Sequence, residues 1–80
     1  MTALRLVDGA EGATFTVLAV CEQSPARASR LAAMGIVAGI EITLVQRRPA
    51  FLLAYETSLL AIDREIAEQV LVEPAEPPGR

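Results

Sequence analysis

The sequence predicts a small, mostly β domain: a closed barrel of about five short strands, one inserted α-helix and a one-turn helix before the last strand. Short β-branched and apolar runs separated by turn residues predict the strands, and only two segments carry helix-start signals. A length of 80 residues indicates one domain. We expect it to span residues 1–73, and residues 74–80, rich in proline, to form a disordered tail.

The first part of the chain predicts one strand and the start of a helix. Gly12 marks a turn, and the β-branched run 14–20 that follows it is typical of a strand. Ser24 and Pro25 then predict a helix N-terminus, because a serine side chain caps free amides and proline suits the first turn. A helix of about ten residues is too short to be stable alone, so it must pack on something.

Two glycines separate this helix from the clearest strand of the chain. Residues 26–34 are good helix formers, and Gly35 stands where a left-handed C-cap residue belongs. Gly39 lets the backbone turn into residues 40–47, where apolar and polar residues alternate as in a half-buried strand. A structural role is therefore the first interpretation of both glycines.

The remaining elements are shorter. Residues 51–56 and 58–62 predict two strands joined by a tight turn. Asp63 can cap a single helical turn over residues 64–69, and residues 70–72 predict the last strand. The order is therefore strand, helix, three strands, helical turn and strand, which favours a small closed barrel.

Composition excludes several kinds of chemistry. The absence of histidine excludes a Ser-His-Asp triad and a His-ligated zinc, and the other residues show no pattern of a catalytic site, a metal site or a cofactor site. Cys21 and Glu22 are the only soft-ligand pairing, and we expect the thiol to be free and partly buried. A net charge of −3 with no Trp, one Tyr and two Phe argues against nucleic-acid binding. No apolar stretch is long enough to span a bilayer, so we expect a soluble, cytoplasmic protein.

The hydrophobic fraction, 52%, is higher than so small a core requires, and it suggests a partner surface. The helix and the loop between the two glycines are the candidate, with core packing as the alternative for the apolar members. Residues 51–53 are a second apolar stretch without an assigned role. The candidate partner residues are Arg27, Arg30, Leu31, Met34, Gly35, Ile36 and Val37. The arginines at 27, 30, 47 and 48 could meet an acidic partner or anionic headgroups, or form a solvated surface.

The segment from Ser24 to Gly39 resembles the pattern Arg-Leu-x-x-Leu/Met-Gly-Ile/Met-x-x-Gly of the ferrous iron transport protein A (FeoA) family, here Arg30-Leu31-Ala32-Ala33-Met34-Gly35-Ile36-Val37-Ala38-Gly39. Gly12 upstream and Val70-Leu71-Val72 downstream are similar to further parts of the family pattern, so that the resemblance covers residues 4 to 73. The chain departs from it at residues 49–52, where many members have Gly-Asp-Pro, and at Asp63, where they have arginine.

The resemblance implies an SH3-like β-barrel that is not an enzyme. It implies a small cytoplasmic accessory protein that binds the cytosolic part of FeoB, the membrane-embedded ferrous iron transporter, and modulates uptake. Such a protein would be peripheral to the inner face of the membrane through its partner, and it could form a homodimer through a strand edge or the helix face. The alternatives are a barrel that binds nucleic acid and a direct metal chaperone or sensor.

Overall fold

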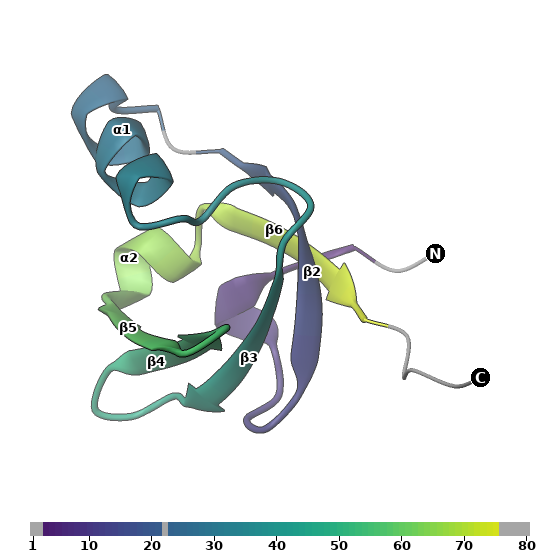
Figure 1. The fold of residues 1–80 in the computed structure, drawn as a ribbon. Helices are drawn as coiled ribbons and strands as arrows, with labels where there is room; N and C mark the ends of the chain where they lie inside the picture. The colour runs from purple at the N-terminus through teal and green to yellow at the C-terminus, as the bar shows by residue number, and fades with distance from the viewer. Residues whose placement is uncertain (1–2, 22, 76–80) are drawn as a thin grey trace.

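The computed structural model describes residues 3–21 and 23–75, in which six strands, two α-helices and a 3-10 turn follow one another (Figure 1). The elements are β1 (Leu4–Arg5), η1 (Leu6–Asp8), β2 (Thr14–Val20), α1 (Pro25–Ala33), β3 (Glu41–Gln46), β4 (Phe51–Tyr55), β5 (Ser58–Ile62), α2 (Arg64–Ala67) and β6 (Val70–Pro74). The predicted order of elements is confirmed, and β1 adds a sixth strand to the expected five.

All strand pairs are antiparallel, and the sheet has the order β1-β6-β2-β3-β4-β5. The two short edge strands, β1 and β5, are not hydrogen-bonded to each other, so the hydrogen-bonded sheet is open where a closed barrel was expected. The helical segments that adjoin these edges, η1 and α2, pack against each other. Side-chain packing rather than a strand pair therefore completes the enclosure of the core.

Two irregularities bend the sheet around the core. The register between β2 and β6 shifts between Val17 and Ala19, and that between β3 and β4 shifts between Leu44 and Gln46. Each shift leaves one extra residue, Leu18 or Val45, opposite the partner strand, which increases local twist and curvature. A sheet of short strands can curl around a small core because of such bends.

The core contains the inward side chains of every strand from β2 to β6, together with those of η1 and both helices. Phe51 and Leu53, which the sequence left without a role, belong to it with exposed fractions of 4% and 0%. They alternate along β4 with the half-buried Leu52, so they share the face of the strand that is turned to the core. The buried residues are Leu6, Val7, Phe15, Val17, Leu31, Ile36, Ile42, Leu44, Phe51, Leu53, Ile62, Ala67, Val70 and Val72.

Both predicted helix caps are present. The Ser24 hydroxyl accepts a hydrogen bond from the Arg27 amide at 3.4 Å, and Pro25 occupies the first turn of α1. At α2, the Asp63 carboxylate accepts from the Ile66 amide at 3.0 Å. The caps therefore fix where each short helix starts.

Neither helix, nor any other helix of the described residues, is long and apolar enough to cross a membrane.

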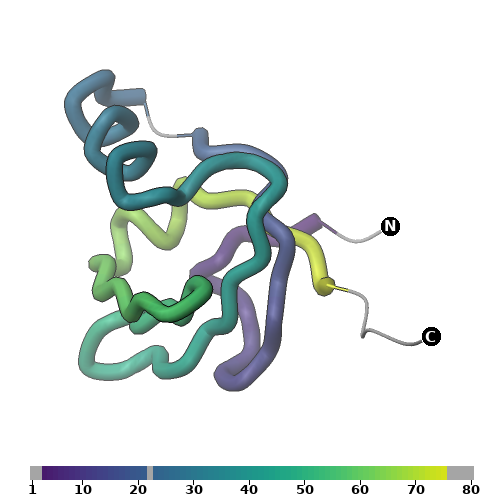
Figure 2. Tube along the Cα trace, in the orientation of Figure 1, coloured from purple at the N-terminus to yellow at the C-terminus, as the bar shows by residue number. Residues whose placement is uncertain are grey.

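The last strand is longer than the sequence indicated. Pro74 in β6 pairs with Phe15 in β2, and the Ala75 amide donates a hydrogen bond to the Thr14 carbonyl at 3.0 Å. Pro74 therefore belongs to β6 and Ala75 is tied to β2, whereas the tail was expected over residues 74–80, of which 76–80 lie outside the described residues. The tube in Figure 2 shows α1 projecting at one end of the molecule, with the β3–β4 turn at the other.

Candidate functional site

The end of α1 is fixed by backbone hydrogen bonds that satisfy its last carbonyl groups. The Gly35 amide donates to the Ala32 carbonyl at 3.0 Å, and the Ile36 amide donates to the Leu31 carbonyl at 2.9 Å. Gly35 has a φ of +93°, the left-handed conformation that glycine adopts without cost. Together these features form a Schellman motif, in which the residue after the glycine characteristically contacts the last turn of the helix.

This motif decides which of the candidate partner residues can meet a partner. Leu31 and Ile36 are the two residues that a Schellman motif brings into apolar contact, and each is only 1% exposed. The expectation that Ile36 belongs to an exposed apolar patch is therefore wrong. For Leu31 the alternative of core packing is the one observed.

The structural interpretation of the two glycines is confirmed. A Cβ on Gly35 would lie 3.1 Å from Cε2 of Tyr55, so the aromatic ring from β4 lies directly against the α1 end. Gly39 has a φ of +99°, and its amide donates to the Val17 carbonyl at 2.7 Å, which ties the loop to β2. The loop between the glycines is thus held by the sheet at both ends.

Four of the candidate residues remain accessible, and we call them the helix-end surface: Arg27, Arg30, Met34 and Val37. Val37 is 42% exposed, Met34 is half-buried, and both arginines are exposed. The Arg27 guanidinium forms an ion pair with Glu65 of α2 at 3.2 Å. Met34 and Val37 are therefore accessible apolar residues at the end of α1, with Arg30 in the last turn of the helix and Arg27 in its first turn. Methionine and arginine are enriched at protein interfaces.

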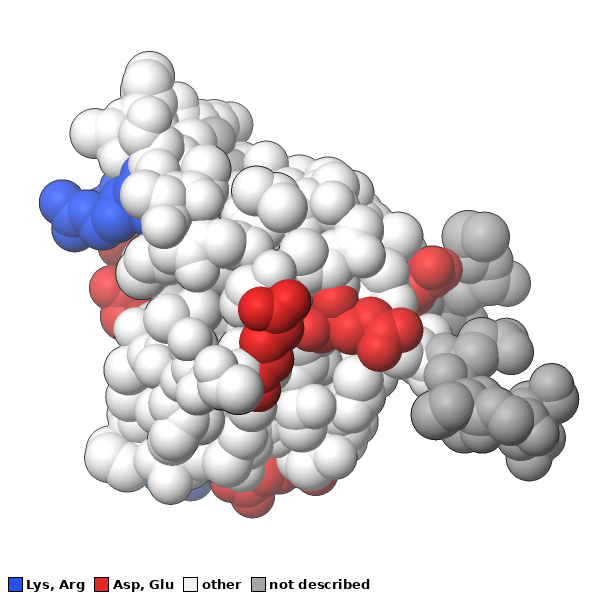
Figure 3. All heavy atoms as spheres, in the orientation of Figure 1, with Lys and Arg blue, Asp and Glu red and all other residues white. Residues whose placement is uncertain are grey.

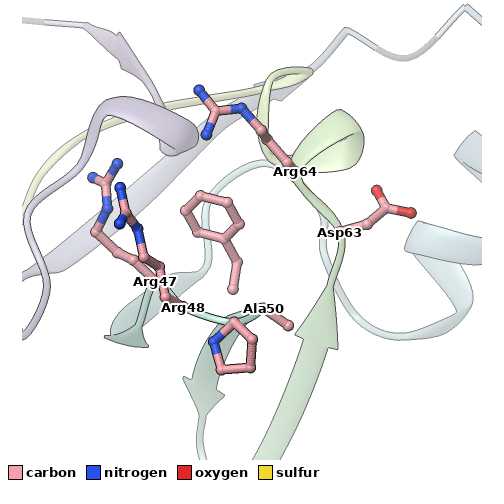
Figure 4. Close-up of a pocket in the computed structure, with 7 residues that line it drawn as sticks. Arg47, Arg48, Ala50, Asp63 and Arg64 are labelled. Atoms are coloured by element: carbon pink, nitrogen blue, oxygen red, sulfur yellow. The ribbon is translucent and has the colours of Figure 1, made fainter.

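A second site, which the sequence did not predict, lies between the β3–β4 turn and the start of α2. It is a pocket of about 380 Å³ (Figure 4), and we call it the arginine pocket. Its lining residues are Arg47, Arg48, Pro49, Ala50, Phe51, Asp63 and Arg64. Three guanidinium groups and one carboxylate are thus gathered around a small apolar wall.

The register of the sheet brings these residues together. Phe51 pairs with Ile62, the last residue of β5, so the chain just before β4 lies beside the chain just after β5. The signal in the sequence was the pair Arg47-Arg48 in front of one strand and Arg64 behind another. Only the pairing of β4 with β5 reveals that they share a site.

The charges of the molecule are unevenly distributed. In Figure 3 acidic side chains cross the middle of the visible face, while basic groups lie at its margins, the largest beside α1. The net charge is −3, and three of the seven arginines line the arginine pocket. The pocket is therefore a local concentration of positive charge on an acidic protein.

In the part of the chain that the structure describes, no three His, Cys, Asp or Glu side chains are close enough to hold a metal ion. Cys21 is exposed rather than partly buried, because it follows β2 outside the core. Its neighbour Glu22 lies outside the described residues.

The fold and its two accessible sites define a small SH3-like β domain. Solved structures with this fold include the FeoA protein of Chlorobium tepidum, 25% identical with a TM-score of 0.82 over 95% of this chain and 75% of that one. The FeoA of Stenotrophomonas maltophilia, solved with zinc and described as a prokaryotic SH3 domain protein, is 24% identical with a TM-score of 0.77 over 88% and 89%.

A domain of larger proteins has the same fold. A manganese-dependent transcriptional repressor in complex with manganese matches with a TM-score of 0.86 and 19% identity over 94% of this chain but only 38% of its own. No curated protein matches the sequence.

The FeoA domain model matches residues 4–74, and the chain therefore belongs to the FeoA family, which is associated with ferrous iron transport. The resemblance read from the helix-to-glycine segment is confirmed.

Proposed function

We propose that this protein is an accessory factor of ferrous iron uptake that binds the cytosolic part of a FeoB-type transporter through its helix-end surface. Membership of the FeoA family supports the pathway, and the exposed Val37 beside the half-buried Met34 is the observation that supports the surface. Binding would bring the domain to the inner face of the membrane, and its role would be regulatory rather than enzymatic.

The physical basis is an apolar contact flanked by positive charge. A side chain that is exposed in the free protein gains by burial in a complex, by about 25 cal/mol for each Å² of apolar surface. Met34 is flexible and can adapt its shape to a partner. Arg30 adds a charged group that favours an acidic partner surface and speeds encounter.

The test is a pull-down of the full-length transporter, and of its cytosolic domain, with the wild-type chain and with Val37→Arg and Met34→Arg. We expect both variants to lose most of the binding. Val45→Arg is the matched control, because Val45 is also 42% exposed but lies on β3, away from α1. Ile36→Arg is unsuitable as a surface probe because Ile36 is buried.

Failure of the folded wild type to bind either form of the transporter would contradict the proposal. So would equal losses for Val37→Arg and Val45→Arg, since the binding surface would then not involve the α1 end.

Anaerobic titration with ferrous iron and a salt series with an oligonucleotide test the metal-carrier and nucleic-acid alternatives. Sedimentation of the free chain tests the homodimer, for which the uncharged edge strand β5 and its 62% exposed Leu59 are a candidate contact.

A further inference from the structure

The arginine pocket has the features of a preformed site for a negatively charged group. Arg47 is held in place at three points. Its guanidinium donates to the Gly9 carbonyl and lies 5.6 Å from the centre of the Phe51 ring, and its amide donates to the Glu11 carboxylate at 3.0 Å. This arginine therefore loses little conformational freedom if a ligand binds beside it.

The other two guanidinium groups are available to a ligand. Within the described part of the chain, the exposed Arg48 makes no ion pair. Arg64 pairs with Glu68 at 3.6 Å, but the two side chains are 71% and 40% exposed, and such a pair is weak in water. A ligand can replace this contact at little cost.

The one carboxylate of the pocket does not neutralise them. Asp63 accepts the hydrogen bond from the Ile66 amide that caps α2. In Figure 4 its carboxylate points away from the pocket, whereas Arg64 extends toward the side on which Arg47 and Arg48 lie. The open side of the pocket therefore presents positive charge.

We propose that the arginine pocket binds the carboxylates of an acidic peptide segment of a protein partner. Planar guanidinium groups pair with carboxylates through two parallel hydrogen bonds, which gives the contact both strength and orientation. Pro49 and Ala50 add an apolar wall that fits the aliphatic part of a glutamate side chain. A volume of about 380 Å³ suits one or two such side chains.

The charge of the whole molecule favours a short peptide over an extended polyanion. A net charge of −3, with acidic side chains across one face (Figure 3), repels a nucleic acid or an anionic bilayer beyond the pocket. A few carboxylates confined to the pocket avoid this repulsion. The site shares no residue with the helix-end surface, and its test uses the chain alone, so the outcome is independent of the proposed transporter partner.

The experiment is an NMR titration of the full ¹⁵N-labelled chain with a terminally blocked tetraglutamate peptide and, as its uncharged match, tetraglutamine. We expect saturable shifts of the amides of residues 47, 48, 50, 51 and 64 and of the Arg48 and Arg64 side chains with tetraglutamate only. Arg48→Gln is expected to weaken binding about tenfold, as the loss of one charge-assisted contact would. Arg5→Gln, the same charge change at an exposed residue of β1, is expected to change it less than about twofold.

Three results would overturn the proposal: no saturable binding of tetraglutamate, equal losses for Arg48→Gln and Arg5→Gln, or shifts that centre outside the pocket. Two further titrations distinguish other anions, one with inorganic phosphate and one with phosphatidylglycerol vesicles. Binding of either without binding of tetraglutamate would also overturn it. Because Arg48 is exposed, an unchanged spectrum outside the pocket checks that Arg48→Gln is folded.

Discussion

The two ends of the molecule turn similar stretches of sequence into different surfaces. At the α1 end, residues 34–37 follow a short helix, and at the β3–β4 turn, residues 49–53 follow a strand. Both stretches are mainly apolar, and the sequence did not assign either of them to the core. In each, the structure buries only some of the large side chains, Ile36 but not Met34 in one, and Phe51 and Leu53 but not Leu52 in the other.

The groups that remain at the surface differ in chemistry between the two ends. The α1 end leaves Met34 and Val37, an apolar contact, whereas the β3–β4 turn leaves guanidinium groups around a pocket. The cause of burial also differs. A local helix-end motif buries Ile36, while Phe51 and Leu53 are buried because they lie on the face of β4 that the sheet turns to the core. Accessibility therefore depends on where the backbone places a side chain, locally in one case and through the sheet in the other, more than on hydrophobicity.

The strongest test of this comparison introduces an arginine at each of two neighbouring positions of the α1 end. We expect Ile36→Arg to lower the free energy of unfolding by about 3–5 kcal/mol, because it removes a packed side chain and buries an unpaired charge. Val37→Arg is expected to change it by less than about 0.5 kcal/mol, as exposed positions usually do. Urea denaturation measures both.

If Ile36→Arg does not fold, Ile36→Ala gives the same comparison, with an expected loss of about 2–4 kcal/mol. Equal stability of the variants at positions 36 and 37 would contradict the burial of Ile36.

The two glycines of the loop allow a finer test. Both have positive φ, so alanine at either position costs about 1 kcal/mol in backbone strain. At Gly35 the added Cβ also lies 3.1 Å from the Tyr55 ring, while at Gly39 it meets nothing within 4 Å. We therefore expect Gly35→Ala to lose about 2 kcal/mol and Gly39→Ala about 1 kcal/mol in the free energy of unfolding, measured by denaturant or heat.

Tyr55→Leu in the background of Gly35→Ala separates the two causes. Removing the ring edge should recover part of the additional loss, and a double-mutant cycle quantifies the coupling. If the effects of the two substitutions on the free energy of unfolding are additive, the Tyr55 ring does not restrict which residue fits at position 35.

The smallest expected effect concerns the cap beside the arginine pocket. Asp63→Ala should lower the free energy of unfolding by about 1 kcal/mol because the Ile66 amide loses its acceptor. Asp63→Asn, which can still cap, should change it by only a few tenths of a kcal/mol. Thermal unfolding of the two variants compares them, and equal losses for Asn and Ala would mean that the carboxylate stabilises the fold by its charge and not by capping α2.

Much of the fold was predictable because its signals are local. The alternation over β3, the Ser24-Pro25 start of α1, the Asp63 cap and the left-handed Gly35 each act within a few residues, and each is observed. The helix-end motif was also within reach of the sequence. An apolar residue after Gly35 and another in the last turn of the helix are its signature, and they indicate that Ile36 turns inward.

The arginine pocket was not predictable in this way. Arg47 and Arg64 are separated by two strands, and nothing near either residue in the sequence refers to the other. The departures from the family pattern at residues 49–52 and at Asp63 marked both segments, but they did not show that the segments are neighbours. The β1 strand was missed for a similar reason, since only pairing with β6 makes two residues a strand.

The sequence by itself determined the class of fold, the caps and glycines that start and end the helices, and the family. These depend on short-range periodicity and on backbone conformations that particular residues favour. The tertiary structure alone decided which apolar residues stay at the surface, where β1 and β5 leave the sheet open, and which arginines share a pocket. Those outcomes depend on pairing between distant strands, whose register brings separate parts of the chain together.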